Sequence, residues 1–143
     1  MAYLGLDYGS KTVGVAICAN DSRIATAKEI IRRDREDKLR RTLARVEELI
    51  AEYKAYDVVI GLPLMPDGDE GERASKARAF AEALKRRCDC RIIFWDERYT
   101  TTSAIDIMDE CGIKKEERHE YVDMIAAQII LQSYLDENNK SGD

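Results

Sequence analysis

Carboxylates far apart in the sequence are the residues best suited to do chemistry. Asp7 interrupts an apolar run near the N-terminus, and Asp123 precedes another near the C-terminus. Asp96 and Glu97 end a third apolar run. Acids that converge without a cation repel one another and raise one another's pKa. Oxygen-rich sites of this kind suit Mg2+ or Mn2+, and two such ions can activate a water and stabilise the leaving oxygen of a phosphodiester.

Each acid also has a purely structural interpretation. Asp7 could cap the turn that follows it by accepting backbone N–H bonds. Asp96 or Glu97 could pair with Arg98, and strand alternation lets only one of the two acids face a given site. Asp123 could be a helix-start acid that the helix dipole favours. The joint placement of the acids, more than any one of them, favours a metal site.

The apolar spacing predicts the elements that must position these acids. Alternation and short apolar runs predict strands, whereas three- and four-residue spacing predicts helices. Strands are expected over residues 3–8, 13–18, 25–31, 57–62 and 91–97. Helices are expected over about 36–53 and 72–87, from Thr100–Thr102 to Gly112, and over about 117–137.

The resulting order, β-β-β-α-β-α-β-α-α, indicates an α/β fold with a five-stranded mixed sheet and helices on its faces. In open sheets, functional residues collect at the carboxyl ends of parallel strands. Asp7 lies near the end of the first expected strand, and Asp96 and Glu97 lie at the end of the fifth. We therefore expect the sheet to bring these acids to one edge, with Asp123 supplied by the final helix.

Length and composition indicate one globular domain, expected over residues 1–137, and a flexible tail at 138–143. The 143 residues match the usual size of a single domain, and 45% of them are hydrophobic while 36% are charged. No run approaches the ~20 apolar residues of a membrane helix. The N-terminus begins directly in a strand pattern without a targeting segment, so we expect a cytoplasmic protein with no membrane partner.

Cysteine and histidine offer little to a metal site. The four cysteines lack zinc-binding spacing, since Cys88 and Cys90 are separated by one residue, and we expect reduced thiols. His119 is the only histidine, which leaves a Ser-His-Asp triad or a His-rich zinc site little to draw on.

The charge pattern is acidic overall but has local basic clusters. A net charge of −5 argues against indiscriminate nucleic-acid binding. Salt screens charges beyond about 8 Å, so local clusters matter more than the sum. We interpret each basic cluster as a solvated helix face or end. The clusters are Arg32, Arg33, Arg35, Lys38, Arg40 and Arg41; Lys85, Arg86 and Arg87; and Lys114 and Lys115.

Four segments are specific in their order and spacing: "LGLDYGSKTVGVA", "VVIGLPLMPDGDEGERA", "DERYTT" and "VDMIAAQIILQSYL". Together they resemble the motifs of the YqgF/RuvX family over residues 3–135. Members of this family are small proteins with an RNase H-like fold, akin to RuvC-type Holliday-junction resolvases. The resemblance implies a metal-dependent nuclease. It departs mildly from the family at Met65-Pro66 and at Tyr99, and neither departure removes a carboxylate.

The resemblance implies site residues at the positions of this sequence that match the family's motifs. Asp7 matches the family's first-strand acid and Asp123 its final-helix acid. The middle acid lies within "DER", where Glu97 is favoured and Asp96 stays open. The expected catalytic residues are thus Asp7, Glu97 and Asp123, and all four acids are candidate ligands of two Mg2+ or Mn2+ ions.

The resemblance also implies the substrate. The family is usually described as processing the 5′ end of pre-16S ribosomal RNA, and some members are reported as Holliday-junction resolvases. We expect ribosomal RNA processing, with junction resolution as the alternative, by a monomer or a homodimer. Lys11, Arg73 and Arg98 are expected to contact phosphates, which would position the backbone without reading sequence.

Two other interpretations stay open at this point. "DYGSKTVG" also resembles the phosphate loop of actin-like kinases and ATPases, although those proteins bind nucleotide between two domains of this kind and the present chain has the length of one. A non-catalytic nucleic-acid-binding domain is the third possibility. The acids and the scarcity of aromatic stacking residues, with two Phe and one Trp, speak against it.

Overall fold

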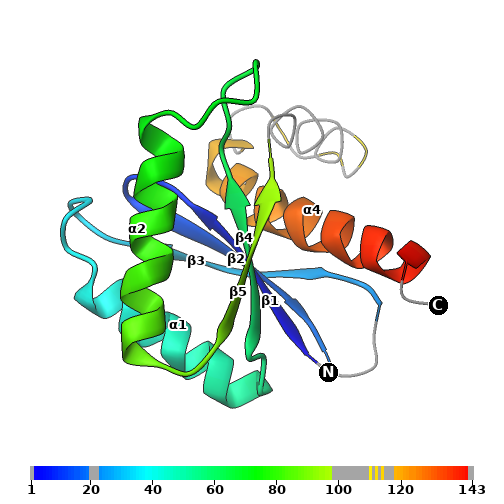
Figure 1. Ribbon diagram of the computed structural model, residues 1–143, viewed down its shortest axis with the longest axis horizontal. Coiled ribbons are helices and arrows are strands. Elements are labelled where there is room, and N and C mark those ends of the chain that lie inside the picture. Colours follow the sequence, from blue (N-terminus) through cyan, green and yellow to red (C-terminus); the bar gives the residue numbers. More distant parts are fainter. Residues whose placement is uncertain are drawn as a thin grey trace.

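A computed structural model describes residues 2–19, 23–97, 110, 112, 114 and 118–141. Its strands and helices follow the expected order along the chain (Figure 1). They are β1 (Tyr3–Tyr8), β2 (Thr12–Cys18), β3 (Thr26–Arg32), α1 (Arg40–Tyr53), β4 (Asp57–Leu62), α2 (Glu72–Arg87), β5 (Arg91–Asp96) and α4 (Arg118–Ser141).

The strands form one mixed sheet in the order β3-β2-β1-β4-β5. β1 and β2 are antiparallel, as are β2 and β3, whereas β1, β4 and β5 are parallel. Every residue of β4 is buried, which is typical of a central parallel strand covered on both faces. The expected five-stranded α/β fold is confirmed. The carboxyl ends of β1, β4 and β5 meet at one end of the sheet, called the carboxyl edge below.

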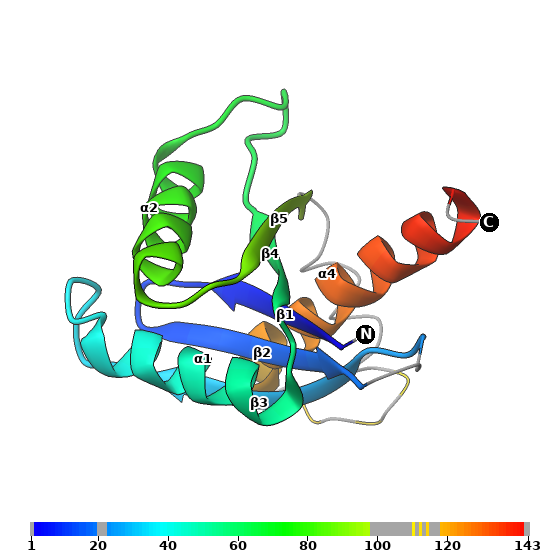
Figure 2. The same ribbon diagram turned by 60° about the horizontal axis from the view of Figure 1, so that its bottom comes forward.

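Helices cover both faces of the sheet. α1 and α2 pack on one face over a core that includes Leu6, Val15 and Phe80. α4 packs on the other face, where Val59 and Leu131 belong to a second core (Figures 1 and 2). Because successive side chains of a strand point to opposite faces, β1, β2, β4 and β5 contribute alternate residues to the two cores. Within the described part of the chain, no helix is long and apolar enough to cross a membrane.

Two helix boundaries differ clearly from the sequence prediction. α1 begins at Arg40, not near residue 36, because Arg33 holds the intervening loop: its Nη2 donates to the Gly9 carbonyl at 2.7 Å. α4 continues to Ser141, past the predicted end at 137, and so includes most of the expected tail. The helix expected to begin at Thr100–Thr102 lies almost entirely outside the described residues.

The cysteines agree with the expectation of unpaired thiols as far as they are described. Cys88 and Cys90 are free, and Cys18 is buried. Cys111 lies outside the described residues.

Candidate active site

Asp7 lies near the end of β1, the central strand of the sheet, and so at the carboxyl edge. Its neighbours Leu6 and Tyr8 belong to the core under α1 and α2, so alternation directs Asp7 towards α4. Asp7 pairs directly with Gly14 of β2. On the other side of β1, Leu6 pairs with Ile60, which brings Gly61 of β4 close to Asp7. Glycines thus flank Asp7 on both neighbouring strands.

The glycine on β2 makes room for Asp123. A Cβ atom added at Gly14 would come within 2.0 Å of the Asp123 carbonyl oxygen, a distance at which no side chain fits. α4 can therefore approach β2 this closely only because position 14 has no side chain. The Thr12 hydroxyl donates a hydrogen bond to Oδ2 of Asp123 and orients its carboxylate.

The glycine on β4 makes room for Glu97. A Cβ atom added at Gly61 would lie 2.4 Å from Oε2 of Glu97, so this carboxylate occupies the space above the glycine. The Glu97 backbone N–H donates to the Leu62 carbonyl at 3.3 Å, which continues the β4–β5 pairing past the end of β5. Asp96 pairs with Leu62, whose side chain belongs to the α1/α2 core, so alternation directs Asp96 to the face opposite Glu97.

The acids perturb one another strongly. Burial, followed by the charge of Asp7, raises the pKa of Glu97 to about 9. Burial also raises the pKa of Asp7 to about 6, the nearby Asp123 charge adds to this, and a hydrogen bond with Glu97 acts in the opposite direction. A hydrogen bond from a protonated Glu97 to an ionised Asp7 explains why this bond raises the pKa of Glu97 and lowers that of Asp7. Asp7, Glu97 and Asp123 therefore form one interacting group of acids, whereas Asp96 acts on Glu97 only as a weaker, more remote charge.

The donor set of these three acids fits a hard divalent cation. Carboxylate oxygens are the ligands that Mg2+ and Mn2+ prefer, and neither histidine nor cysteine is among the groups that interact here. A cation would also offset the burial and repulsion that raise the pKa of Asp7 and Glu97. As they stand, the described side chains include no group of three acids, histidines or cysteines close enough together to hold a metal ion. Binding would thus require the Glu97 proton to leave and the carboxylates to close on the ion.

The predicted phosphate-binding residues have different surroundings. Lys11 is exposed in the turn between β1 and β2, next to the acids. Arg73 lies near enough to Asp7 to lower its pKa, but its Nη1 donates to Glu36 at 2.9 Å. Arg98 lies outside the described residues.

Sequence reasoning missed Thr12 as a partner of Asp123. The two residues are 111 positions apart, and only the docking of α4 on β2 brings them together. The sole available signal was that Thr12 follows Asp7 within the same turn motif, which does not identify its partner.

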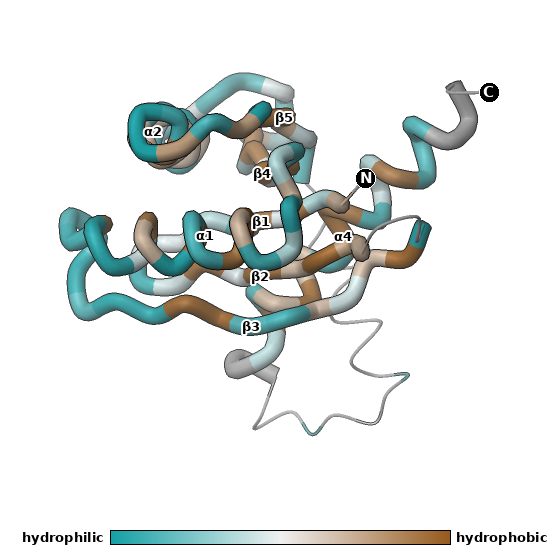
Figure 3. The backbone as a smooth tube through the Cα atoms, turned by 90° about the horizontal axis from the view of Figure 1, so that it is seen from below, coloured by the Kyte–Doolittle hydropathy of each residue, from teal (hydrophilic) through white to brown (hydrophobic). Residues whose placement is uncertain are grey.

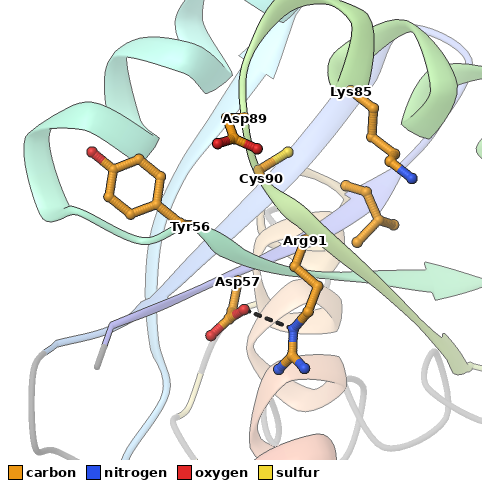
Figure 4. A pocket seen from close by; sticks show the side chains of 7 residues that line it. Tyr56, Asp57, Lys85, Asp89, Cys90 and Arg91 are labelled. Carbon is orange, nitrogen blue, oxygen red and sulfur yellow. Dashed lines mark hydrogen bonds and ion pairs between the residues drawn. The ribbon is translucent and has the colours of Figure 1, made fainter.

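A large cavity lies at the opposite end of the sheet. It has a volume of about 710 Å³ and is lined by residues at the starts of β4 and β5 (Figure 4). There the Arg91 guanidinium donates to Asp57 at 2.8 Å, so the buried carboxylate is neutralised by a cation. This cavity holds none of the acids of the carboxyl edge.

Structural comparison identifies resolvase-like neighbours. RuvC from T. thermophilus in complex with a Holliday-junction substrate aligns with 99% of this chain and 96% of its own, at a TM-score of 0.61 and 14% identity. A fowlpox virus resolvase in complex with Holliday-junction DNA aligns with 96% of this chain and 98% of its own, at a TM-score of 0.58 and 15% identity. These neighbours show that the fold is RNase H-like.

Sequence comparison identifies much closer relatives. A protein of Agathobacter rectalis, named "Putative pre-16S rRNA nuclease", is 52% identical over 138 residues that cover 95% of each chain. A protein of Lachnospira eligens with the same name is 42% identical over 98% of this chain and all of its own. Residues 1–137 match the family model described as "RuvX: Holliday junction resolvase". The chain therefore belongs to the RuvX family.

Proposed function

We propose that this protein is a divalent-metal-dependent nuclease that processes the 5′ end of pre-16S ribosomal RNA. The observation that carries the proposal is the convergence of Asp7, Glu97 and Asp123 over two glycines at the carboxyl edge. Resolvase-like nucleases generally use divalent metals. The names of the relatives from A. rectalis and L. eligens support ribosomal RNA as the substrate. Family membership favours a nuclease over the ATP-binding and non-catalytic alternatives.

Junction resolution is the second candidate function. The description of the matching family supports it, and the structural neighbours that carry the same fold were solved with Holliday junctions. A four-way junction has twofold symmetry and is most simply cut by a dimer, whereas a monomer suffices to trim an RNA end. Either reaction uses cytoplasmic nucleic acid, and we propose the cytoplasm as the site of action.

The three acids would hold Mg2+ or Mn2+, most simply as a pair of ions. Bound there, the metal would supply an activated water and charge stabilisation for the leaving oxygen of the phosphodiester. Glu97 holds a proton in the absence of metal and must release it for its carboxylate to serve as a ligand. The Thr12 hydroxyl keeps the Asp123 carboxylate turned towards the sheet. Lys11, Arg73 and Arg98 are the proposed contacts to substrate phosphates.

The test is cleavage of a pre-16S RNA 5′ fragment and of a synthetic four-way junction, side by side, with Mg2+ or Mn2+. The substitution Asp7→Asn should lower turnover at least a hundredfold, which corresponds to about 2.7 kcal/mol of transition-state stabilisation. Folding should survive, because removing one charge from the group of acids relieves repulsion. Glu82→Gln is the matched control: it removes one acid from the exposed face of α2.

Substrate choice and site assignment are separable in this assay. Preferential cleavage of the RNA supports processing, and preferential cleavage of the junction by a dimer supports resolution. Full activity in both Asp7→Asn and Asp123→Asn would show that the site has been wrongly assigned.

A further inference from the structure

A second cavity, called the β3–α1 pocket here, lies between the end of β3 and the first turn of α1. Its volume is about 560 Å³, within the range of ligand-binding pockets. The loop that forms it is strongly hydrophilic (Figure 3). The cationic side chains that line it are Arg32, Arg33, Lys38, Arg40 and Arg41.

The charge of the β3–α1 pocket is opposite in sign to the net charge of the chain. The protein carries −5 overall, yet five cations and only two acids line this pocket. Of the two acids, Asp37 already pairs with Arg35 at 3.3 Å. Among the described residues, none of the five cations forms an ion pair with a carboxylate. An excess of positive charge therefore remains for a ligand.

Arg33 fixes the inner wall of the pocket. Its Nη2 donates to the Gly9 carbonyl at 2.7 Å, and its guanidinium stacks over the Tyr8 ring at 4.9 Å from the ring centre. Its Nη1 is buried and has no hydrogen-bond partner in the described structure. The positive charge is thus held in place beside the turn that follows Asp7, and the nearby Glu36 carboxylate is ion-paired with Arg73.

Strand pairing places the pocket at the carboxyl edge, beside the turn that follows Asp7. Arg32 of β3 pairs directly with Thr12 of β2, and directly opposed residues project from the same face of a sheet. Thr12 is the residue whose hydroxyl donates to Asp123. The pocket therefore lies at the same edge of the sheet as the acids, with Arg33 and α1 on the α1/α2 face and the acids on the face that α4 covers.

We propose that the β3–α1 pocket binds backbone phosphates of the substrate strand beside the cleaved bond. The identity of this ligand rests on the proposed nuclease function. A group of acids repels a polyanion, and cations next to it compensate by neutralising flanking phosphates and steering the strand. The contacts are to phosphates, so RNA and DNA strands are bound through the same side chains.

The test compares two double substitutions that remove the same charge. Arg40→Gln/Arg41→Gln changes two exposed residues in the pocket, and Lys85→Gln/Arg86→Gln changes two exposed residues at the end of α2, where the chain leads into the start of β5. Glutamine keeps helix propensity in both. Binding of a fluorescein-labelled RNA stem-loop and of a labelled four-way DNA junction is measured by anisotropy over a series of KCl concentrations, in EDTA to prevent metal-dependent cleavage.

The pocket variant should bind both probes about tenfold or more weakly and reduce the slope of log K against log salt by about two. The α2 variant should bind like the unmodified protein. Equal weakening in both variants, no weakening in the pocket variant, or no binding by the unmodified protein would overturn the proposal. Selective weakening together with absence of cleavage in Mg2+ would contradict the nuclease function and leave the phosphate site supported.

Discussion

The two ends of the sheet treat buried carboxylates in opposite ways. At the starts of β4 and β5, Asp57 is only 8% exposed and accepts a hydrogen bond from Arg91 at 2.8 Å. At the carboxyl edge, Asp7 and Glu97 face each other, and the pKa of each is raised. A carboxylate paired with an arginine stabilises the fold, whereas carboxyl groups that face one another reduce its stability in the absence of a cation.

The size of a cavity does not indicate which end of the sheet carries the unbalanced charge. The larger cavity, of about 710 Å³, lies at the end where the buried acid is already neutralised (Figure 4). The carboxyl edge has the unbalanced negative charge, and the β3–α1 pocket beside it has the unbalanced positive charge. Uncompensated charge, more than volume, distinguishes the end of this molecule that is suited to chemistry.

The largest effect is expected from closing the space at the carboxyl edge. Gly14→Ala places a Cβ against the backbone of Asp123, which cannot rotate away, so α4 must move off β2. Overpacking of this kind costs about 1–3 kcal/mol, and we expect the upper end of that range in urea unfolding, with cleavage activity also lost. Gly5→Ala, whose Cβ would meet the Leu131 side chain at 2.7 Å, should cost less. Stability equal to the unmodified protein in Gly14→Ala would contradict the close approach of α4.

A smaller loss of stability is expected from a substitution at the opposite end of the sheet, where β4 and β5 begin. Asp57→Asn removes the charge that Arg91 contacts, and hydrogen bonds to charged groups contribute about 1.5–3 kcal/mol when buried. Because Arg91 is largely exposed, we expect a loss of about 1 kcal/mol in the free energy of unfolding. Cleavage below the unfolding transition should not change. A hundredfold loss of activity in a folded Asp57→Asn protein would show that the two ends are not functionally separate.

An effect of similar size but opposite sign is expected at Glu97, and it has a defined pH dependence. The pKa of Asp7 rises from an ordinary value of 3.8 to about 6 in the folded protein, and that of Glu97 rises from 4.5 to about 9. Between about pH 4 and pH 9 the folded pair therefore binds protons that the unfolded chain has released, so stability falls as pH rises. Glu97→Gln should flatten this dependence and stabilise the metal-free protein at pH 8 by about 1 kcal/mol.

Thermal unfolding in EDTA across this pH range measures the effect. Glu82→Gln, which removes an exposed acid from α2, controls for net charge. Identical pH profiles for Glu97→Gln and the unmodified protein would show that the two carboxylates do not interact.

The succession of strands and helices along the chain could be predicted from the sequence, because it depends on local patterns of apolar residues. Apolar alternation defined β1 to β5, and acids at the ends of β1 and β5 indicated a shared edge. The choice between Asp96 and Glu97 could not be made in this way. It depends on the register of β5 against β4, in which Gly61 pairs with Trp95 and leaves its open face to the Glu97 carboxylate.

Other features depend on long-range contacts that no local pattern records. The sequence predicts a helix face or end for the basic residues after β3. Arg40 and Arg41 do begin α1, whereas Arg33 donates to the Gly9 carbonyl and lies in the loop that lines the β3–α1 pocket. Arg73 was expected to contact phosphate, and its ion pair with Glu36 arises only when α2 packs against the loop before α1. Such pairings are decided by tertiary packing.

The hydrogen bond between Thr12 and Asp123 has a consequence for the newly made chain. The turn that carries Asp7 leaves the ribosome early, but its partner Asp123 is synthesised 111 residues after Thr12. The set of three acids is therefore incomplete on any nascent polypeptide that has not yet released α4. The site at the carboxyl edge is therefore assembled only in the last stage of folding, when α4 packs on β2.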